Sequence, residues 1–125
     1  MAHLRRKFHD IHVTLPKEQQ ANSNTAKALA YCNTIYTLDK QSRDVSIKER
    51  GDFKQTRIKP LMNEFKDWLN EKQLTSAPNS SYGKAINYAV NYLPTIMNYL
   101  LDSRLELDNN RAERAIKPFI IGRNN

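Results

Sequence analysis

Apolar residues recur along this chain at spacings of three and four, not in strict alternation, and glycine occurs at only three positions. This period is typical of amphipathic helices, so the sequence predicts a mainly α-helical protein. The strongest stripe lies within residues 81–101, where Pro94 is expected to bend the helix. Its apolar positions are Ile86, Ala89, Val90, Leu93, Ile96, Met97, Leu100 and Leu101.

Three further helices are predicted, over residues 2–12, 24–38 and 46–74. Pro16 follows the first, and a kink or break is expected at Pro60 within the third. Residues 39–44 and 75–81 are polar and are expected to form loops, and residues 104–107 a short extended segment. The helix starts carry capping signals: a capping box at Ser46 and Glu49, then Ser80 or Ser81, and four candidates within residues 22–25.

Length and charge narrow the class of protein. The 125 residues suffice for one small domain, and the net charge of +7 favours a polyanionic partner, although basic residues spread along the chain also suit a solubilising surface. No apolar run approaches a membrane span and the N-terminus resembles no secretory signal, which favours a cytoplasmic protein without a membrane partner. Cys32, the single cysteine, lies in an apolar stretch and is expected to be a buried structural thiol.

Two sets of side chains have both a plain and a functional interpretation. Tyrosines around the last long helix are more typical of a core boundary than of a platform for stacking bases; they are Tyr82, Tyr88, Tyr92 and Tyr99. His9 and His12 are three residues apart and could share a metal ion, but no accompanying carboxylate pattern supports this, and a surface pair is favoured.

The segment 107–119 carries the densest candidate chemistry. Asn110 is placed as an N-cap with Glu113 at the third helical position, which suits either a capping partner or a metal ligand. Asp108 and Asn109 fit turn chemistry, or oxygen donors to a metal or phosphate. Cationic side chains surround Glu113 in the sequence, namely Arg111, Arg114 and Lys117.

Several segments, in order, resemble the catalytic region of bacterial transposases of the insertion-sequence 66 family. The start, Ala2-His-Leu-Arg-Arg-Lys-Phe8, is similar to the family's Ala-His-x-Arg-Arg-x-Phe motif. Residues 59–61 with Trp68-Leu69, and then Gly83-Lys-Ala-Ile86, resemble its helical region. The hallmark is Leu105-Glu-Leu-Asp-Asn-Asn110 followed by Ala112-Glu-Arg-Ala-Ile-Lys-Pro118, and Gly122-Arg123 resembles the start of the tail.

The resemblance implies a DDE-type transposase, whose ribonuclease-H-like fold holds two Mg²⁺ ions with two Asp and a final Glu. By motif match, Glu113 takes the place of that Glu as catalytic residue and metal ligand, with Asp108, Asn109 and Asn110 as motif support. In the family both aspartates precede the motif that begins here at residue 2. We therefore expect a fragment: a basic helix (1–15), a helical insertion (16–103) and the Glu-bearing motif with a truncated tail (104–125), with the sheet mostly absent.

A lone Glu113 would bind Mg²⁺ weakly, because this ion demands several oxygen ligands in octahedral geometry. We expect the chain alone to be inactive, whereas the parent would cleave and join DNA at transposon ends and target. Contacts to DNA are expected from Arg5, Arg6, Arg111, Arg114 and Lys117. Self-association would follow from an apolar patch where the sheet would dock. The alternatives are a stand-alone basic helical nucleic-acid-binding module and a helical interaction domain.

Overall fold

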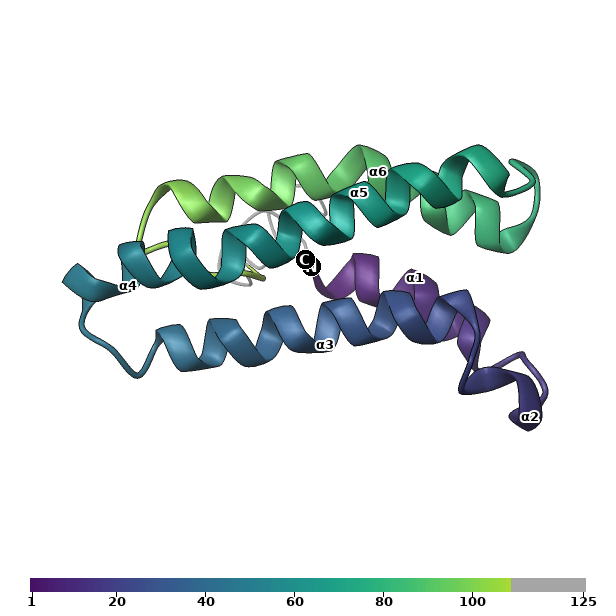
Figure 1. The fold of residues 1–125 in the computed structure, drawn as a ribbon, viewed down its shortest axis with the longest axis horizontal. Coiled ribbons are helices and arrows are strands. Elements are labelled where there is room, and N and C mark those ends of the chain that lie inside the picture. The colour runs from purple at the N-terminus through teal and green to yellow at the C-terminus, as the bar shows by residue number, and fades with distance from the viewer. Residues whose placement is uncertain (109–125) are drawn as a thin grey trace, which may run out of the picture.

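The computed structural model describes residues 1–108, which form a mainly helical bundle (Figure 1). The helices are α1 (Ala2–His12), α2 (Lys17–Gln20), α3 (Asn24–Ser42), α4 (Ile47–Phe53), the π-helix η1 (Lys54–Ile58), α5 (Lys59–Thr75), α6 (Ser81–Ile96) and the 3₁₀-helix η2 (Met97–Leu101). Residues 1–108 contain no strand, which confirms the expected mainly α class for this part of the chain. No helix within this range is long and apolar enough to cross a bilayer.

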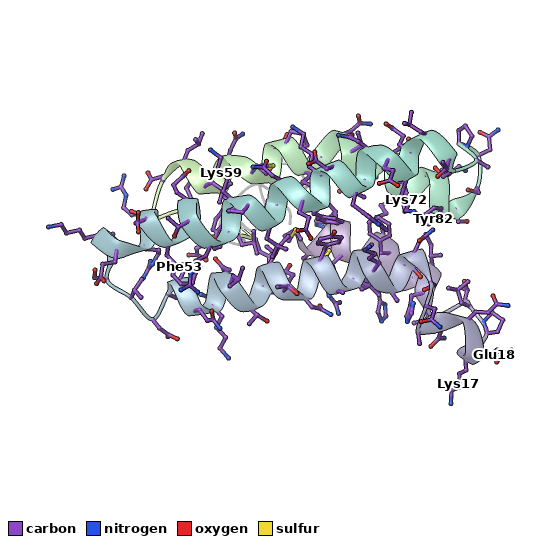
Figure 2. All side chains as sticks on the ribbon, in the orientation of Figure 1. Lys17, Glu18, Phe53, Lys59, Lys72 and Tyr82 are labelled. Atoms are coloured by element: carbon purple, nitrogen blue, oxygen red, sulfur yellow. The ribbon has the colours of Figure 1, made fainter. Side chains whose placement is uncertain are left out.

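The long helices run antiparallel to their neighbours in sequence. α3 is followed by the continuous run α4–η1–α5 in the opposite direction, and α6 returns along α5 (Figure 1). The shorter α1 packs against α3 and α6 and covers one half of the bundle. Residues 102–108, here named the exit segment, run back from the end of η2 to the start of α1. The small helix α2, which carries Lys17 and Glu18, projects away from the bundle (Figure 2).

The core consists of most of the apolar positions that the sequence pattern predicts, but Leu101, at the end of the strongest predicted stripe, is 79% exposed. Side chains from α1, α3, α5 and α6 are fully buried, among them Phe8, Ile35, Phe65 and Ile86. Tyr31 stacks on Phe65 at a centroid distance of 4.9 Å and extends this core toward α5. Cys32 has no exposed surface, and burial raises the pKa of its thiol to about 12, which confirms a buried structural thiol.

Serine hydroxyls cap three of the long helices. Ser23 accepts from the amide of Ala26 at 3.0 Å, which selects one cap from the four candidates within residues 22–25. Ser46 accepts from the amide of Glu49 at 3.2 Å and donates to its carboxylate at 2.9 Å, so the predicted capping pair is confirmed. Ser80, not Ser81, caps α6.

The loop predicted over residues 39–44 was wrong, and of the kink or break predicted at Pro60 the break does not occur. The expected loop 39–44 begins inside α3, which continues to Ser42 because the carboxylate of Asp39 is buried and accepts a hydrogen bond from the Tyr99 hydroxyl. Pro60 does not break the third helix. The π-helix η1 precedes it, with the amide of Lys59 bonded to the carbonyl of Lys54, and Pro60 then lies in the first turn of α5, where a missing N–H is tolerated.

The exit segment also differs in detail from the extended conformation expected for residues 104–107. A turn forms at Ser103 and Arg104, where the amide of Arg104 donates to the Asp102 carboxylate at 2.9 Å and the amide of Leu105 donates to the Asp102 carbonyl at 3.2 Å. The chain is irregular over residues 105–108, and Leu107 is buried. The exit segment is therefore fixed mainly by contacts with other elements.

Candidate functional site

Most of the predicted site lies outside the described residues. This applies to Asn109, Asn110, Arg111, Glu113, Arg114 and Lys117, whose proposed roles stay predictions. The described members are Arg5 and Arg6 on α1, and Asp108 at the end of the exit segment.

The carboxylate of Asp108 joins the exit segment to α1 and α3. Its Oδ1 accepts from the Tyr36 hydroxyl at 2.8 Å and from the amide of Ala2 at 2.9 Å, and it lies 3.5 Å from the N-terminal amino group. Helix α1 has no acidic residue in its first turn and no side-chain cap from Met1, so Asp108 satisfies one of the unpaired amides of that helix start. Burial, and then this hydrogen bond, raise the pKa of Tyr36.

A basic hollow lies on one side of this junction. It has a volume of about 600 Å³ and is lined by Ala2, Arg5, Arg6, His9, Asp10 and Tyr36. The Arg5 side chain is oriented by a hydrogen bond from Nε to the Asn33 amide oxygen at 2.9 Å, while Arg6 is exposed. Through Tyr36 and Ala2, the structure brings the two predicted DNA-contacting arginines close to Asp108. Two cations beside an open hollow are suited to phosphate oxygens.

A second, mainly apolar groove of about 310 Å³ is lined in part by Asp108 itself. Tyr88 and Tyr92 line it, with ring centroids 5.1 Å apart in an edge-to-face contact. Tyr92 is 44% exposed, whereas Tyr99 is buried and donates its hydroxyl to Asp39 at 2.5 Å. The tyrosines thus range from core to surface, as expected for residues that flank a helical core.

Lys54 is a buried cation that the sequence analysis missed. Its side chain has no exposed surface, and Nζ donates to the carbonyls of Tyr99 at 3.1 Å, Asp102 at 2.9 Å and Leu105 at 2.8 Å. Nζ also lies 3.8 Å from the centre of the Tyr99 ring. Burial lowers the pKa of Lys54, with nearby Asp39 opposing the shift. A spacing signal existed, because Lys54 lies four residues before the buried Ile58, on the stripe that continues to Met62.

The histidine pair contacts different partners. His12 Nδ1 lies 3.2 Å from the Thr25 hydroxyl, and His9 Nδ1 lies 3.8 Å from the Asp10 carboxylate. Across residues 1–108, histidine, cysteine and acidic side chains do not gather in groups of three that could hold a metal ion. Asp108 in particular has Oδ1 already engaged by Tyr36 and Ala2.

Comparison with known proteins identifies the family. The model of the IS66 transposase family matches residues 1–125. Uncharacterized protein y4qI of Sinorhizobium fredii is 31% identical over 99% of this chain and 22% of its own length. Uncharacterized proteins y4hP and y4jD of the same organism are 26% and 28% identical, over 24% of each. The chain thus spans about a quarter of these relatives, and no solved structure gives a significant match.

The family match covers every motif on which the resemblance rested, from the arginine pair on α1 to the segment that contains Glu113. This chain belongs to the IS66 family of transposases.

Proposed function

We propose that this chain forms the helical insertion and the Glu-bearing motif of a DDE-type transposase, whose catalytic domain has a ribonuclease-H-like fold. The parts are the basic helix within residues 1–15, the insertion 16–103 and the motif region 104–125. A whole transposase of this type would cleave and join DNA at transposon ends and target. The observation that carries the proposal is the position of the basic hollow, directly beside the residue from which the chain continues into the Glu113 motif.

The arrangement of the chain supports an inserted unit that extends over residues 2–108, and so includes the basic helix beside the insertion 16–103. The amide of Ala2 and the carboxylate of Asp108 are 2.9 Å apart although 106 positions separate them in sequence. An insertion must leave and rejoin its host domain at nearly the same place, and domains whose ends lie close together satisfy this requirement. The bundle between these two residues has its own apolar core, contributed by α1, α3, α5 and α6.

We assign Glu113 as the metal ligand and catalytic carboxylate that this chain supplies. Mg²⁺ in the parent site would activate a water or a DNA 3′-hydroxyl and stabilise the leaving oxygen. The described residues alone do not fit this ion, because no group of three candidate ligands gathers within 1–108 and Asp108 is engaged in protein hydrogen bonds. We therefore assign no catalytic step to the described part and expect Mg²⁺ binding by this chain alone to be weak.

DNA contact is assigned to the arginines of the basic hollow together with the cations of the motif. Arg5 and Arg6 lie on the same hollow, and Arg111, Arg114 and Lys117 follow Asp108 within nine residues. The role proposed for all five is sequence-independent contact with phosphates, which fixes register on the duplex.

Salt-dependent binding to duplex DNA tests this assignment. Each lost phosphate contact lowers the slope of log affinity against log salt by about 0.9. Arg5→Gln combined with Arg6→Gln should therefore lower the slope by about 2. The matched control is Lys59→Gln with Lys66→Gln, which removes the same charge from exposed positions on α5 (Figure 2 labels Lys59) and should change the slope much less.

If both double variants lowered the salt slope equally, the basic hollow would be only part of a diffuse positive surface and not a specific DNA contact. Measurable affinity with steep salt dependence but no contribution from Glu113 to metal binding would favour a stand-alone nucleic-acid-binding module. Absence of binding at low salt would favour a helical interaction domain.

A further inference from the structure

The exit segment is tied to the bundle at both of its ends. We propose that Lys54 and Tyr36 are positioning residues: Lys54 fixes the start of the exit segment, Tyr36 fixes Asp108 at its end, and together they set where the Glu113 motif begins. The inference rests on the proposed function only for the role of Glu113. The positioning itself is a property of this chain and can be measured without DNA or metal.

The first tie is the ammonium of Lys54. Its three acceptors, the carbonyls of Tyr99, Asp102 and Leu105, all belong to the end of η2 and the exit segment. Gln55, the next residue, donates from its amide to the Leu100 carbonyl at 2.9 Å. Two adjacent side chains of η1 therefore bind four carbonyls, and those of Tyr99 and Leu100 belong to the last turn of η2, where a helix leaves carbonyls unpaired.

The second tie is the carboxylate of Asp108. Tyr36 on α3 and the first amide of α1 both donate to Oδ1, so this residue is held from two helices at once. Leu107, directly before it, is buried in the apolar core. Residue 108 thus has a fixed position on the bundle, in the wall of the apolar groove and bonded to two residues that line the basic hollow.

The choice of lysine at position 54 follows from its three N–H donors as well as from its volume. Burial of an ammonium is costly, and an apolar side chain of similar volume on the same stripe would avoid that cost but would leave the carbonyls of Tyr99 and Leu105 without their Lys54 donor. Lysine fixes the position of the backbone around it, because one charged group with three donors holds carbonyls from three separate positions of the chain. Lys54 is the first residue of the π-helix η1, and π-helical turns are common near functional sites.

Distances between spin labels test the positioning directly. In a Cys32→Ala background, one label is placed by Glu106→Cys at an exposed position of the exit segment and the other by Lys40→Cys on the exposed face of α3. The parent should give a narrow distance distribution. Lys54→Met and Tyr36→Phe should each cause loss of the narrow peak, while circular dichroism confirms that the helices are retained.

The matched controls are Lys59→Met, which alters an exposed lysine, and Tyr92→Phe, which removes a hydroxyl from the 44% exposed tyrosine. Both should keep the narrow peak. A broad distribution in the parent, or a narrow one in Lys54→Met and Tyr36→Phe, would overturn the proposal.

Chemical rescue separates the ammonium from mere filling of space. Lys54→Ala leaves room beside the three carbonyls and the Tyr99 ring, and added propylammonium should restore the narrow peak. Tetramethylammonium carries the same charge but has no N–H donor and should not. Rescue by both cations or by neither would overturn the role of the ammonium. If rescue succeeds while Glu113→Gln leaves metal affinity unchanged, the positioning stands and the proposed function of Glu113 fails.

Discussion

The turn between α5 and α6 requires glycine at position 83. A Cβ at this position would lie 1.9 Å from the carbonyl oxygen of Ala77 and 2.8 Å from its carbon, and both atoms are backbone. The Ala77 oxygen also accepts from the Ser80 hydroxyl at 2.7 Å and from the Ser80 amide at 3.1 Å. Gly83→Ala must therefore displace the turn by about 1 Å or more to reach ordinary contact, and the Ser80 cap moves with it.

The free energy of unfolding should fall by about 1–3 kcal/mol in this variant. Displacement of a packed segment costs about 1–3 kcal/mol, and a weakened N-cap costs about 1 kcal/mol. The better helix propensity of alanine returns about 1 kcal/mol. Gly51→Ala is the matched control. Gly51 lies inside α4, and a Cβ there would meet only the Cβ of Ser103, at an ordinary van der Waals distance of 3.6 Å. That variant should be more stable by about 0.5–1 kcal/mol.

Urea unfolding followed by far-ultraviolet circular dichroism measures both changes from the shift of the midpoint at constant slope. The diagnostic result is that glycine-to-alanine substitution lowers the free energy of unfolding at position 83 and raises it at position 51. If Gly83→Ala were as stable as the parent, or if both variants shifted alike, the close approach of Ala77 to α6 would be refuted.

Three further predictions follow from local environments. Burial raises the pKa of Cys32 from 9.0 to about 12, so the thiol of the unfolded chain loses its proton first as the pH rises. The free energy of unfolding, measured relative to that of Cys32→Ala, should therefore fall by about 1.4 kcal/mol by pH 10. A difference between the two proteins that stays constant from about pH 8 to pH 10 would contradict this. Ser23→Ala removes the acceptor of the Ala26 amide and should cost about 1 kcal/mol in urea unfolding, whereas no loss would mean the cap is dispensable. The purified chain should not cleave plasmid DNA with Mg²⁺, and nicking abolished by Glu113→Gln would overturn its predicted inactivity.

Local sequence signals predicted much of the bundle. The stripe in residues 81–101 and the serine caps depend on neighbours three or four residues away, and such patterns determine a helix and its start without tertiary information. Ser46 and Ser80 therefore cap as expected. The preference for Ser23 over its neighbours follows from its geometry, since it accepts from the amide three residues on.

Long-range contacts decided the features that sequence patterns did not predict. Residues 39–42 look polar, yet Asp39 is held inside the bundle by Tyr99, which is 60 positions away. Lys54 resembles a solvated lysine until the carbonyls of residues 99, 102 and 105 are placed around it. The pairing of Ala2 with Asp108 has no local signature at all. Buried polar side chains depend on partners from distant elements, and a pattern within one element cannot supply them.

The contact between Ala2 and Asp108 also means that the two ends of the bundle lie side by side. A short linker from residue 108 back to residue 1 would join the helices into a circular chain, which could then be opened at another exposed turn. New termini opened in the exposed turn at Pro78 and Asn79 would then leave the packing of α1, α3, α5 and α6 in place. The order of the helices along the chain depends only on which ends are linked, whereas their packing depends on the core. A circular permutant should therefore retain this fold.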